Sequence, residues 1–221
     1  MTGAAASFYF DLASPLAYLA AERVLHVLPG PAQWRPVLAR ELPGGERFEG
    51  FRCGQERDIF RAELARRARE LELQPLRWPD PFPFDSELAM RVATYAASIG
   101  RAVGFAQAAF RQAFAGGHSL QEPDNVLIAA AACEMHPAAV QAAAERPSLQ
   151  RQLLACTADA AKQGVGDVPA ILIGARVFAG ERALEQAAAH MRAAAGAQAT
   201  ASSAAAAAPA LAPAPAPAGG R

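Results

Sequence analysis

A stretch near the N-terminus, SFYFDLASPLAYLAAERVL at residues 7–25, limits the fold most strongly. Its first four residues form an apolar, aromatic run with the length and composition of a buried strand. From Pro15 to about Leu28 the apolar residues recur near a spacing of 3.6, which predicts a helix with proline in its first turn. The sequence therefore predicts a strand that passes directly into a helix, with Ser14 and no cysteine at the junction.

The C-terminal part of the patterned sequence carries a hairpin signal. Residues 170–178 contain two short apolar segments, AILI and RVF, which are joined by a Gly-Ala pair. We expect a helix from Glu181 to about Ala194. From Gly196 onward the chain is mostly alanine, proline and serine, so burial cannot offset the entropy of ordering and we expect a disordered tail.

Between these ends the pattern is mainly helical. Residues 33–38, QWRPVL, are predicted to form a second strand, in which Pro36 favours an edge position. The segment PLRWPDPFPFDS, residues 75–86, is too rich in proline for regular structure. Helices are predicted near residues 55–72, 86–99, 101–115 and 148–162, with another that starts at Pro123.

This order of elements predicts an α/β fold with a mixed sheet and helices on both faces. It is the thioredoxin arrangement with a large all-helical insertion between the two halves of the thioredoxin domain. We place the thioredoxin-like domain at residues 7–39 and 150–195, the helical insertion domain at 40–149 and the disordered Ala/Pro-rich tail at 196–221.

Composition excludes several classes of partner. The 21 Lys+Arg residues balance the 21 Asp+Glu residues, so we expect no nucleic-acid partner. No run approaches the roughly 18 uncharged apolar residues of a membrane span, and a signal peptide is not expected. Cys53, Cys133 and Cys156 are odd in number and far apart, which argues against a secreted disulfide framework and predicts a cytoplasmic location.

Ser14 has two interpretations, and the local sequence leaves both open. A serine followed by proline is a common helix N-cap, which is the purely structural interpretation. The start of a helix also presents unpaired N–H groups and roughly half a positive charge, which favour an anion. A serine hydroxyl there could donate a hydrogen bond to a thiolate that is brought in from outside.

Other candidate residues are also ambiguous on their own. Val168-Pro169 precedes a strand, where a cis bond would expose the Val168 backbone to an extended peptide, although a trans bond is the ordinary case. Glu181 would either complement the helix dipole or bind an ammonium group. Asp11 follows the first strand and is open to a structural or a functional role. The four histidines lack metal-ligand spacing, so we expect no metal site.

Three motifs, FYFDLASPLAYLA, PLRWPDPFPFDS and GVGDVPAILIGARVFAGERALE, join these features in one order. Across about residues 7–192 the chain resembles the 2-hydroxychromene-2-carboxylate isomerases. These are relatives of the kappa-class glutathione transferases in the DsbA-like branch of thioredoxin folds. The first and last motifs together are fairly specific for this group.

The resemblance implies glutathione as cofactor. Ser14 would take the place of the redox cysteine as the catalytic residue and hydrogen-bond the glutathione sulfur. It further implies that Pro169 is cis, that the Val168 backbone binds glutathione, and that Glu181 holds the γ-glutamyl end. The implied function is a glutathione-dependent cis–trans isomerase that acts on a small aromatic-catabolism intermediate by transient thiolate addition. We expect it to be a homodimer.

Two departures from the family pattern keep other functions open. Family members usually carry an asparagine in the loop after the second strand, whereas the one asparagine here is Asn125. The segment GDVP stands where apolar-Gly-Val-Pro is more usual. The alternatives are a kappa-like glutathione transferase and a non-catalytic thioredoxin-fold binding protein. A dithiol oxidoreductase is disfavoured, because Ser14 and Ala17 leave no Cys-x-x-Cys at the helix start.

Overall fold

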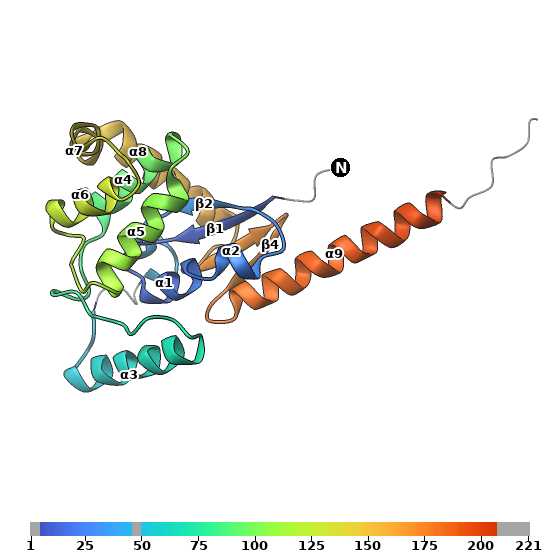
Figure 1. Ribbon diagram of the computed structural model, residues 1–221, viewed down its shortest axis with the longest axis horizontal. Coiled ribbons are helices and arrows are strands. Elements are labelled where there is room, and N and C mark those ends of the chain that lie inside the picture. The colour runs from blue at the N-terminus through green and yellow to red at the C-terminus, as the bar shows by residue number, and fades with distance from the viewer. Residues whose placement is uncertain (1–4, 46–49, 207–221) are drawn as a thin grey trace, which may run out of the picture.

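A four-stranded mixed sheet forms the centre of the molecule, with the strand order β2–β1–β3–β4 (Figure 1). The computed structural model describes residues 5–45 and 50–206, with residues 198–206 described by their backbone alone. Strand β1 (Ala6–Phe10) pairs in parallel with β2 (Ala32–Pro36). It pairs antiparallel with β3 (Ala170–Ile173), which forms a hairpin with β4 (Arg176–Ala179). The predicted mixed sheet is confirmed, and β2 with its proline lies at an edge.

Alternation along β1 divides the interior between the two faces of the sheet. Phe8 and Phe10 belong to the larger apolar cluster, in which they pack with Trp34 and with residues of α1, α5 and α9. Tyr9 belongs to a smaller cluster on the other face, where Ala160 of α8 contributes. These helices are α1 (Pro15–Ala21), α5 (Ala102–Phe114), α8 (Pro147–Lys162) and α9 (Ala183–Ala206).

The helix predicted from Pro15 to about Leu28 is divided in the structure. Helix α1 ends at Ala21, and a short α2 (Val24–Val27) follows. At the break, Arg23 donates its backbone N–H to the Ala20 carbonyl at 2.9 Å, an i→i+3 bond of the tighter 3₁₀ type. The side chains at the break point to distant elements, since Glu22 pairs with Arg111 and Arg23 with Glu185. Long-range ion pairs thus accompany a break that local periodicity did not reveal.

The segment between β2 and β3 is helical apart from its loops. The predicted helices are present, with boundaries shifted by one or two residues, and α7 is an additional helix. His136 caps its start, where Pro137 occupies the first helical position. The further elements of this segment are η1 (Ala39–Glu41), α3 (Gly54–Glu70), α4 (Glu87–Ser98), α6 (Pro123–Ala131) and α7 (Pro137–Glu145).

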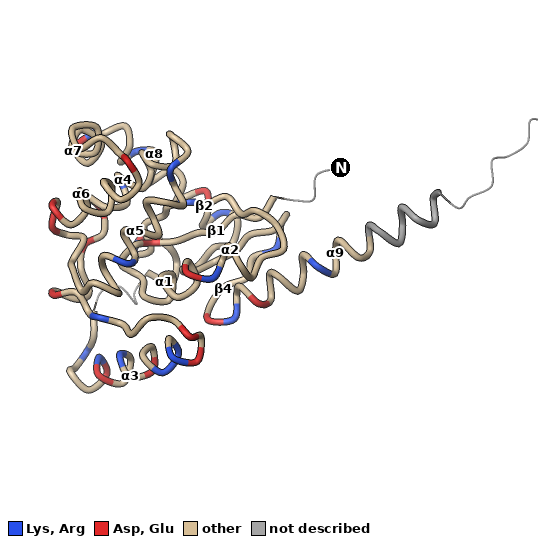
Figure 2. The backbone as a smooth tube through the Cα atoms, in the orientation of Figure 1, with Lys and Arg blue, Asp and Glu red and all other residues tan. Residues whose placement is uncertain are grey.

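Helix α3 lies at the periphery beside α1, and it buries little more than Leu64 and Ala68 (Figure 1). Basic and acidic residues alternate along this helix (Figure 2). An aromatic cluster fills the space between α3, the proline-rich loop and α5. Its central residue is Trp78, whose ring lies 4.9 Å from Phe82 and 6.1 Å from Phe60, with the Arg61 guanidinium 5.1 Å from its face.

Helix α9 departs from the prediction at both ends. It begins at Ala183 instead of Glu181, and it continues to Ala206 instead of ending near Ala194. The first part of the predicted disordered tail is therefore helical, and it extends away from the body (Figure 1). Alanine has the strongest intrinsic helix propensity and the single Gly196 costs only about 1 kcal/mol, so an alanine-rich segment can continue an anchored helix. Residues 207–221 of the predicted tail lie outside the described residues.

Candidate active site

Ser14 is buried at the start of α1, where it is the helix N-cap. Its Oγ accepts a hydrogen bond from the Ala17 N–H at 3.2 Å. Its own backbone N–H donates to the Asp11 carbonyl at 3.0 Å. Within the described residues, no acceptor takes the Ser14 hydroxyl hydrogen. The cap interpretation is confirmed. The Ser14 hydroxyl can still donate its hydrogen to a ligand.

The Asp11 carboxylate holds the loop that carries Ser14. It is only 2% exposed, and its two oxygens accept the N–H groups of Ala13 at 2.9 Å and Ala39 at 2.8 Å. The Ser86 side chain at the start of α4 hydrogen-bonds the same carboxylate. Burial raises the pKa of Asp11, and these hydrogen bonds offset that effect only in part. One buried carboxylate thus ties the β1–α1 loop to two segments of the helical block.

A pocket of about 430 Å³ opens in front of Ser14. Val168 lies on the same pocket, so the structure brings two of the predicted site residues together. The opposite wall comes from the helical block and is strongly aromatic. Its main contributors are Phe51, Arg52, Phe60, Phe82 and Pro83.

A second cavity of about 280 Å³ adjoins this pocket, because Ala13 and Pro83 line both. Its polar lining includes Asp11, Ser86 and Arg40. Arg40 donates to Asp85 at 2.9 Å and to Glu87 at 2.6 Å, and so holds the end of the proline-rich loop. Since that loop carries Phe82 and Pro83 of the pocket lining, the Arg40 hydrogen bonds help to hold this part of the aromatic wall in place.

The peptide bond between Val168 and Pro169 is cis, as the family resemblance implied. The Val168 N–H donates to Oδ1 of the neighbouring Asp167 at 2.7 Å. Asp167 also lines the large pocket, and sequence reasoning gave it no role. The signal that would have identified it was the departure from the usual apolar-Gly-Val-Pro pattern directly before Pro169.

Pro169 and Glu181 do not line the large pocket. They meet instead at a narrow cavity of about 20 Å³, beside Arg23 and Arg67. Leu16 lines both this cavity and the large pocket, so the two are neighbours. Glu181 is exposed in the turn before α9. The four predicted cofactor-binding residues therefore lie along one continuous face, with Ser14 and Val168 at one end.

An ion pair that the sequence did not indicate joins the start of α2 to α9 next to this narrow cavity. Arg23 contacts Glu185 at 2.7 Å. Burial opposes ionisation of Glu185, but its hydrogen bond from Arg23 and the nearby positive charges outweigh burial and lower its pKa. The pair fixes the start of α9, and with it the turn that bears Glu181.

Comparison with known proteins identifies the family. The model of the DsbA-like thioredoxin domain matches residues 6–192. The chain belongs to the DsbA-like thioredoxin family. Among proteins with curated annotation, none matches it in sequence.

Solved structures agree with this membership at the level of the fold. The structure of a 2-hydroxychromene-2-carboxylate isomerase superposes with a TM-score of 0.71 at 16% identity, covering 90% of this chain and 97% of that one. A probable DsbA oxidoreductase from Streptomyces coelicolor gives a TM-score of 0.69 at 18% identity, with coverage of 87% and 90%. The cytosolic disulfide reductase DsbM from Pseudomonas aeruginosa, solved with GSH, gives 0.60 at 15% identity, with coverage of 89% and 99%.

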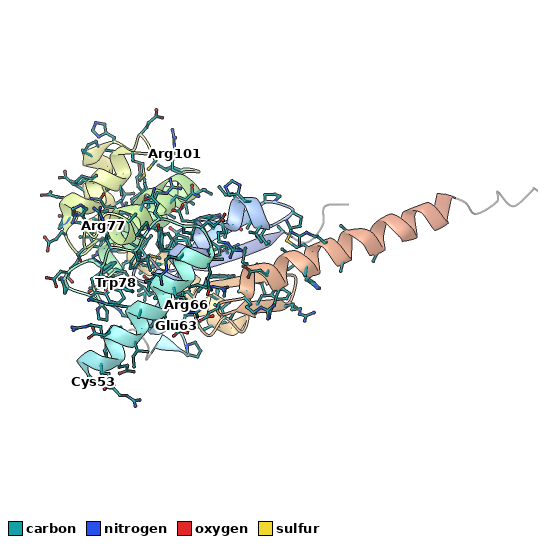
Figure 3. All side chains as sticks on the ribbon, turned by 60° about the horizontal axis from the view of Figure 1, so that its bottom comes forward. Cys53, Glu63, Arg66, Arg77, Trp78 and Arg101 are labelled. Atoms are coloured by element: carbon teal, nitrogen blue, oxygen red, sulfur yellow. The ribbon has the colours of Figure 1, made fainter. Side chains whose placement is uncertain are left out.

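Within the DsbA-like family, this member has no cysteine at the helix start. Cys133 is buried, Cys156 is partly buried, and burial raises the pKa of both thiols. Cys53 is exposed at the outer end of α3 and does not line the large pocket (Figure 3). The described lining of the large pocket thus contains no cysteine.

The loop between η1 and α3 contains no asparagine or glutamine. The part of the loop after η1 that reaches the pocket supplies Gly50, Phe51 and Arg52, while residues 46–49 lie outside the described ranges. Asn125 lies on α6, where its amide donates to the Ser119 carbonyl at 2.8 Å. It is thus a structural residue away from the pocket lining.

Among the described residues, no helix combines the length and the apolar character that crossing a bilayer requires. In the same part of the chain, no three His, Cys, Asp or Glu side chains group as metal ligands would.

Proposed function

We propose that this protein is a glutathione-dependent cis–trans isomerase of the 2-hydroxychromene-2-carboxylate type. The observation that carries the proposal is the large pocket, in which a hydroxyl donor, Ser14, and the residue before a cis proline, Val168, face an aromatic wall. Membership of the DsbA-like family and the likeness in fold to a 2-hydroxychromene-2-carboxylate isomerase support it. DsbM, solved with GSH, supports glutathione as the cofactor.

Ser14 is the proposed catalytic residue, because its hydroxyl can donate to the glutathione sulfur. A free thiol with a pKa of about 8.5 is only roughly 3% ionised at pH 7, and lowering that pKa by about two units requires about 2.7 kcal/mol. A hydrogen bond to a charged group contributes about 1.5–3 kcal/mol. Helix α1 has only seven residues, so its dipole adds less than this hydroxyl. The Ser14 hydrogen bond is the main source of thiolate stabilisation.

The remaining cofactor contacts follow the face described above. The Val168 backbone would pair with the cysteinyl part of glutathione, next to Pro169. Glu181 would hold the γ-amino group at the other end, where its carboxylate is exposed to ligand. The distribution of these residues along one face supports an extended tripeptide with its sulfur directed at Ser14.

The aromatic wall suits a flat, conjugated substrate. Bound glutathione would supply a thiolate that can add reversibly to a conjugated system and so permit rotation about a former double bond without an oxidant or reductant. Ser14 would hold that sulfur, and the rings of Phe51, Phe60 and Phe82 would orient the substrate beside it.

The test is a titration with reduced glutathione followed by turnover of 2-hydroxychromene-2-carboxylate. By linkage, glutathione at about 100 times its Kd adds about 2.7 kcal/mol to the free energy of unfolding. We expect thermal stabilisation and isomerisation without net loss of glutathione. Absence of stabilisation by millimolar glutathione would overturn the cofactor assignment.

The same assay separates the alternatives. Net consumption of glutathione with an electrophilic substrate would indicate a kappa-like transferase. Stabilisation without turnover of either substrate would indicate a thioredoxin-fold binding protein. We further propose a cytoplasmic homodimer, a state supported by the unpaired cysteines for location and by the family resemblance for assembly. Light scattering and fractionation test these two points.

A further inference from the structure

The turn before β3 contains a contact that competes with the proposed cofactor. The Val168 N–H, which would pair with a peptide thiol, already donates to the Asp167 carboxylate at 2.7 Å. Asp167, Val168 and Ser14 all line the 430 Å³ pocket. The contact therefore lies inside the pocket that the glutathione sulfur and backbone would enter.

The main chain around Asp167 is fixed by a close approach of two loops. The Gly44 N–H donates to the Gly166 carbonyl at 2.7 Å. A Cβ at Gly44 would lie only 2.7 Å from the Gly166 oxygen and 3.4 Å from the Asp167 Cβ, so this approach requires glycine. The turn is thereby braced, and the Asp167 carboxylate is held beside the Val168 N–H.

We propose that Asp167 is a specificity-determining residue that weakens the binding of glutathione. It does so by occupying the Val168 N–H, which a peptide ligand would otherwise take. This inference rests on the proposed function, because it assumes that glutathione pairs with the Val168 backbone.

The existing hydrogen bond opposes the binding of a peptide at this turn. A peptide that pairs with Val168 must first displace a hydrogen bond to a charged acceptor, which is stronger than one to a neutral group. The free energy gained by the new pairing is reduced by the cost of that exchange.

Calorimetric titration of the full chain with reduced glutathione tests the proposal. In Asp167→Ala the competing acceptor is removed, and we expect the Kd to fall about tenfold. In Asp167→Asn a neutral amide oxygen can still accept from Val168, but more weakly than a carboxylate, so an intermediate Kd is expected. The matched control is Asp159→Asn, which makes the same charge change at an exposed site on α8 paired with Lys162 at 3.1 Å.

The possible results separate this inference from the proposed function. Equal Kd values for the wild type and Asp167→Ala would overturn the role of Asp167 alone. Weaker binding by Asp167→Ala would also overturn it, because Asp167 would then be a ligand of glutathione. Failure of every variant, wild type included, to bind would overturn the glutathione site as well. If Asp167→Ala unfolds, Asp167→Asn must still bind more tightly than the Asp159→Asn control.

Discussion

The two chain segments that meet at the large pocket prepare for a ligand in opposite ways. At the β1–α1 junction, Ser14 accepts one hydrogen bond and keeps its hydroxyl hydrogen for a ligand. At the turn before β3, the Val168 N–H is already taken by Asp167. Under the proposed function, the first segment would stabilise a charged sulfur, whereas the second would exchange an internal contact for a ligand. Reactivity and affinity would then depend on different residues and could be changed separately.

Removal of the Asp11 carboxylate should destabilise the β1–α1 junction and give the largest loss in the free energy of unfolding. In Asp11→Ala the N–H groups of Ala13 and Ala39 lose their acceptors in a buried region. Each unsatisfied buried group costs about 1–3 kcal/mol, so we expect a loss of about 2–5 kcal/mol in the free energy of unfolding. Urea denaturation at pH 7 measures it. A loss below about 0.5 kcal/mol, the level expected for an exposed control such as Asp159→Ala, would contradict this account.

The same variant has a characteristic pH dependence. Because burial raises the pKa of Asp11 in the folded state, the unfolded chain releases this proton at lower pH than the folded protein. The stability that the raised pKa contributes is therefore present below the unfolded value of about 3.9, and it is lost as pH rises through the folded pKa. The stability difference between wild type and Asp11→Ala should shrink from acid toward neutral pH. A difference that grows with pH would show that the carboxylate is stabilised as the anion.

Ser14→Ala tests the same segment at the level of chemistry. Removing a hydrogen bond to a thiolate should lower isomerase activity about 10- to 100-fold and raise the pKa of the bound glutathione thiol. The loss of the cap should lower stability by only about 1 kcal/mol. Titration of thiolate absorbance with bound glutathione measures the pKa shift, with the exposed Ser148→Ala as control. An unchanged thiol pKa would remove Ser14 from the catalytic role.

Arg23→Gln should give the smallest effect, since it breaks the partly exposed Arg23–Glu185 pair between the start of α2 and the first turn of α9. A partly exposed ion pair contributes about 0–1 kcal/mol, so only a slight fall in Tm is expected. The pKa of Glu185 is lowered, and this stability is therefore present above its unfolded value and lost as pH falls through the folded pKa. The Tm values of the wild type and Arg23→Gln should converge as the pH falls. A Tm difference that stays constant with pH would show that Arg23 acts through packing and not through its charge.

Local patterns were sufficient to predict the sheet and most helices. Three of these signals depend only on residues that are close in sequence: the aromatic run of β1, the Gly-Ala turn of the hairpin and the edge proline of β2. In that turn Gly174 has φ +61°, which glycine adopts without strain. The Ser-Pro pair likewise predicted Ser14 as a helix cap, and the family resemblance implied the cis bond before Pro169, because both depend on short motifs.

The features that sequence reasoning missed depend on contacts between distant segments. Asp11 was left open because its partners Ala39 and Ser86 are brought to it only by the folded helical block. Similarly, no periodicity indicates that Arg23 reaches Glu185, or that α1 breaks there. The extension of α9 was missed for a different reason, because low complexity was interpreted as disorder although alanine itself favours helix.

The positions of the two tryptophans provide separate optical reporters for these parts of the molecule. Trp34 is buried in the sheet core against Phe8, whereas Trp78 packs behind Phe60 and Phe82, which line the pocket. With Trp34→Phe, the remaining fluorescence comes from the ring behind the substrate wall and should respond when a conjugated ligand enters. With Trp78→Phe, the remaining fluorescence comes from Trp34 and reports unfolding of the sheet. The two variants therefore allow ligand occupancy of the pocket and stability of the fold to be measured independently.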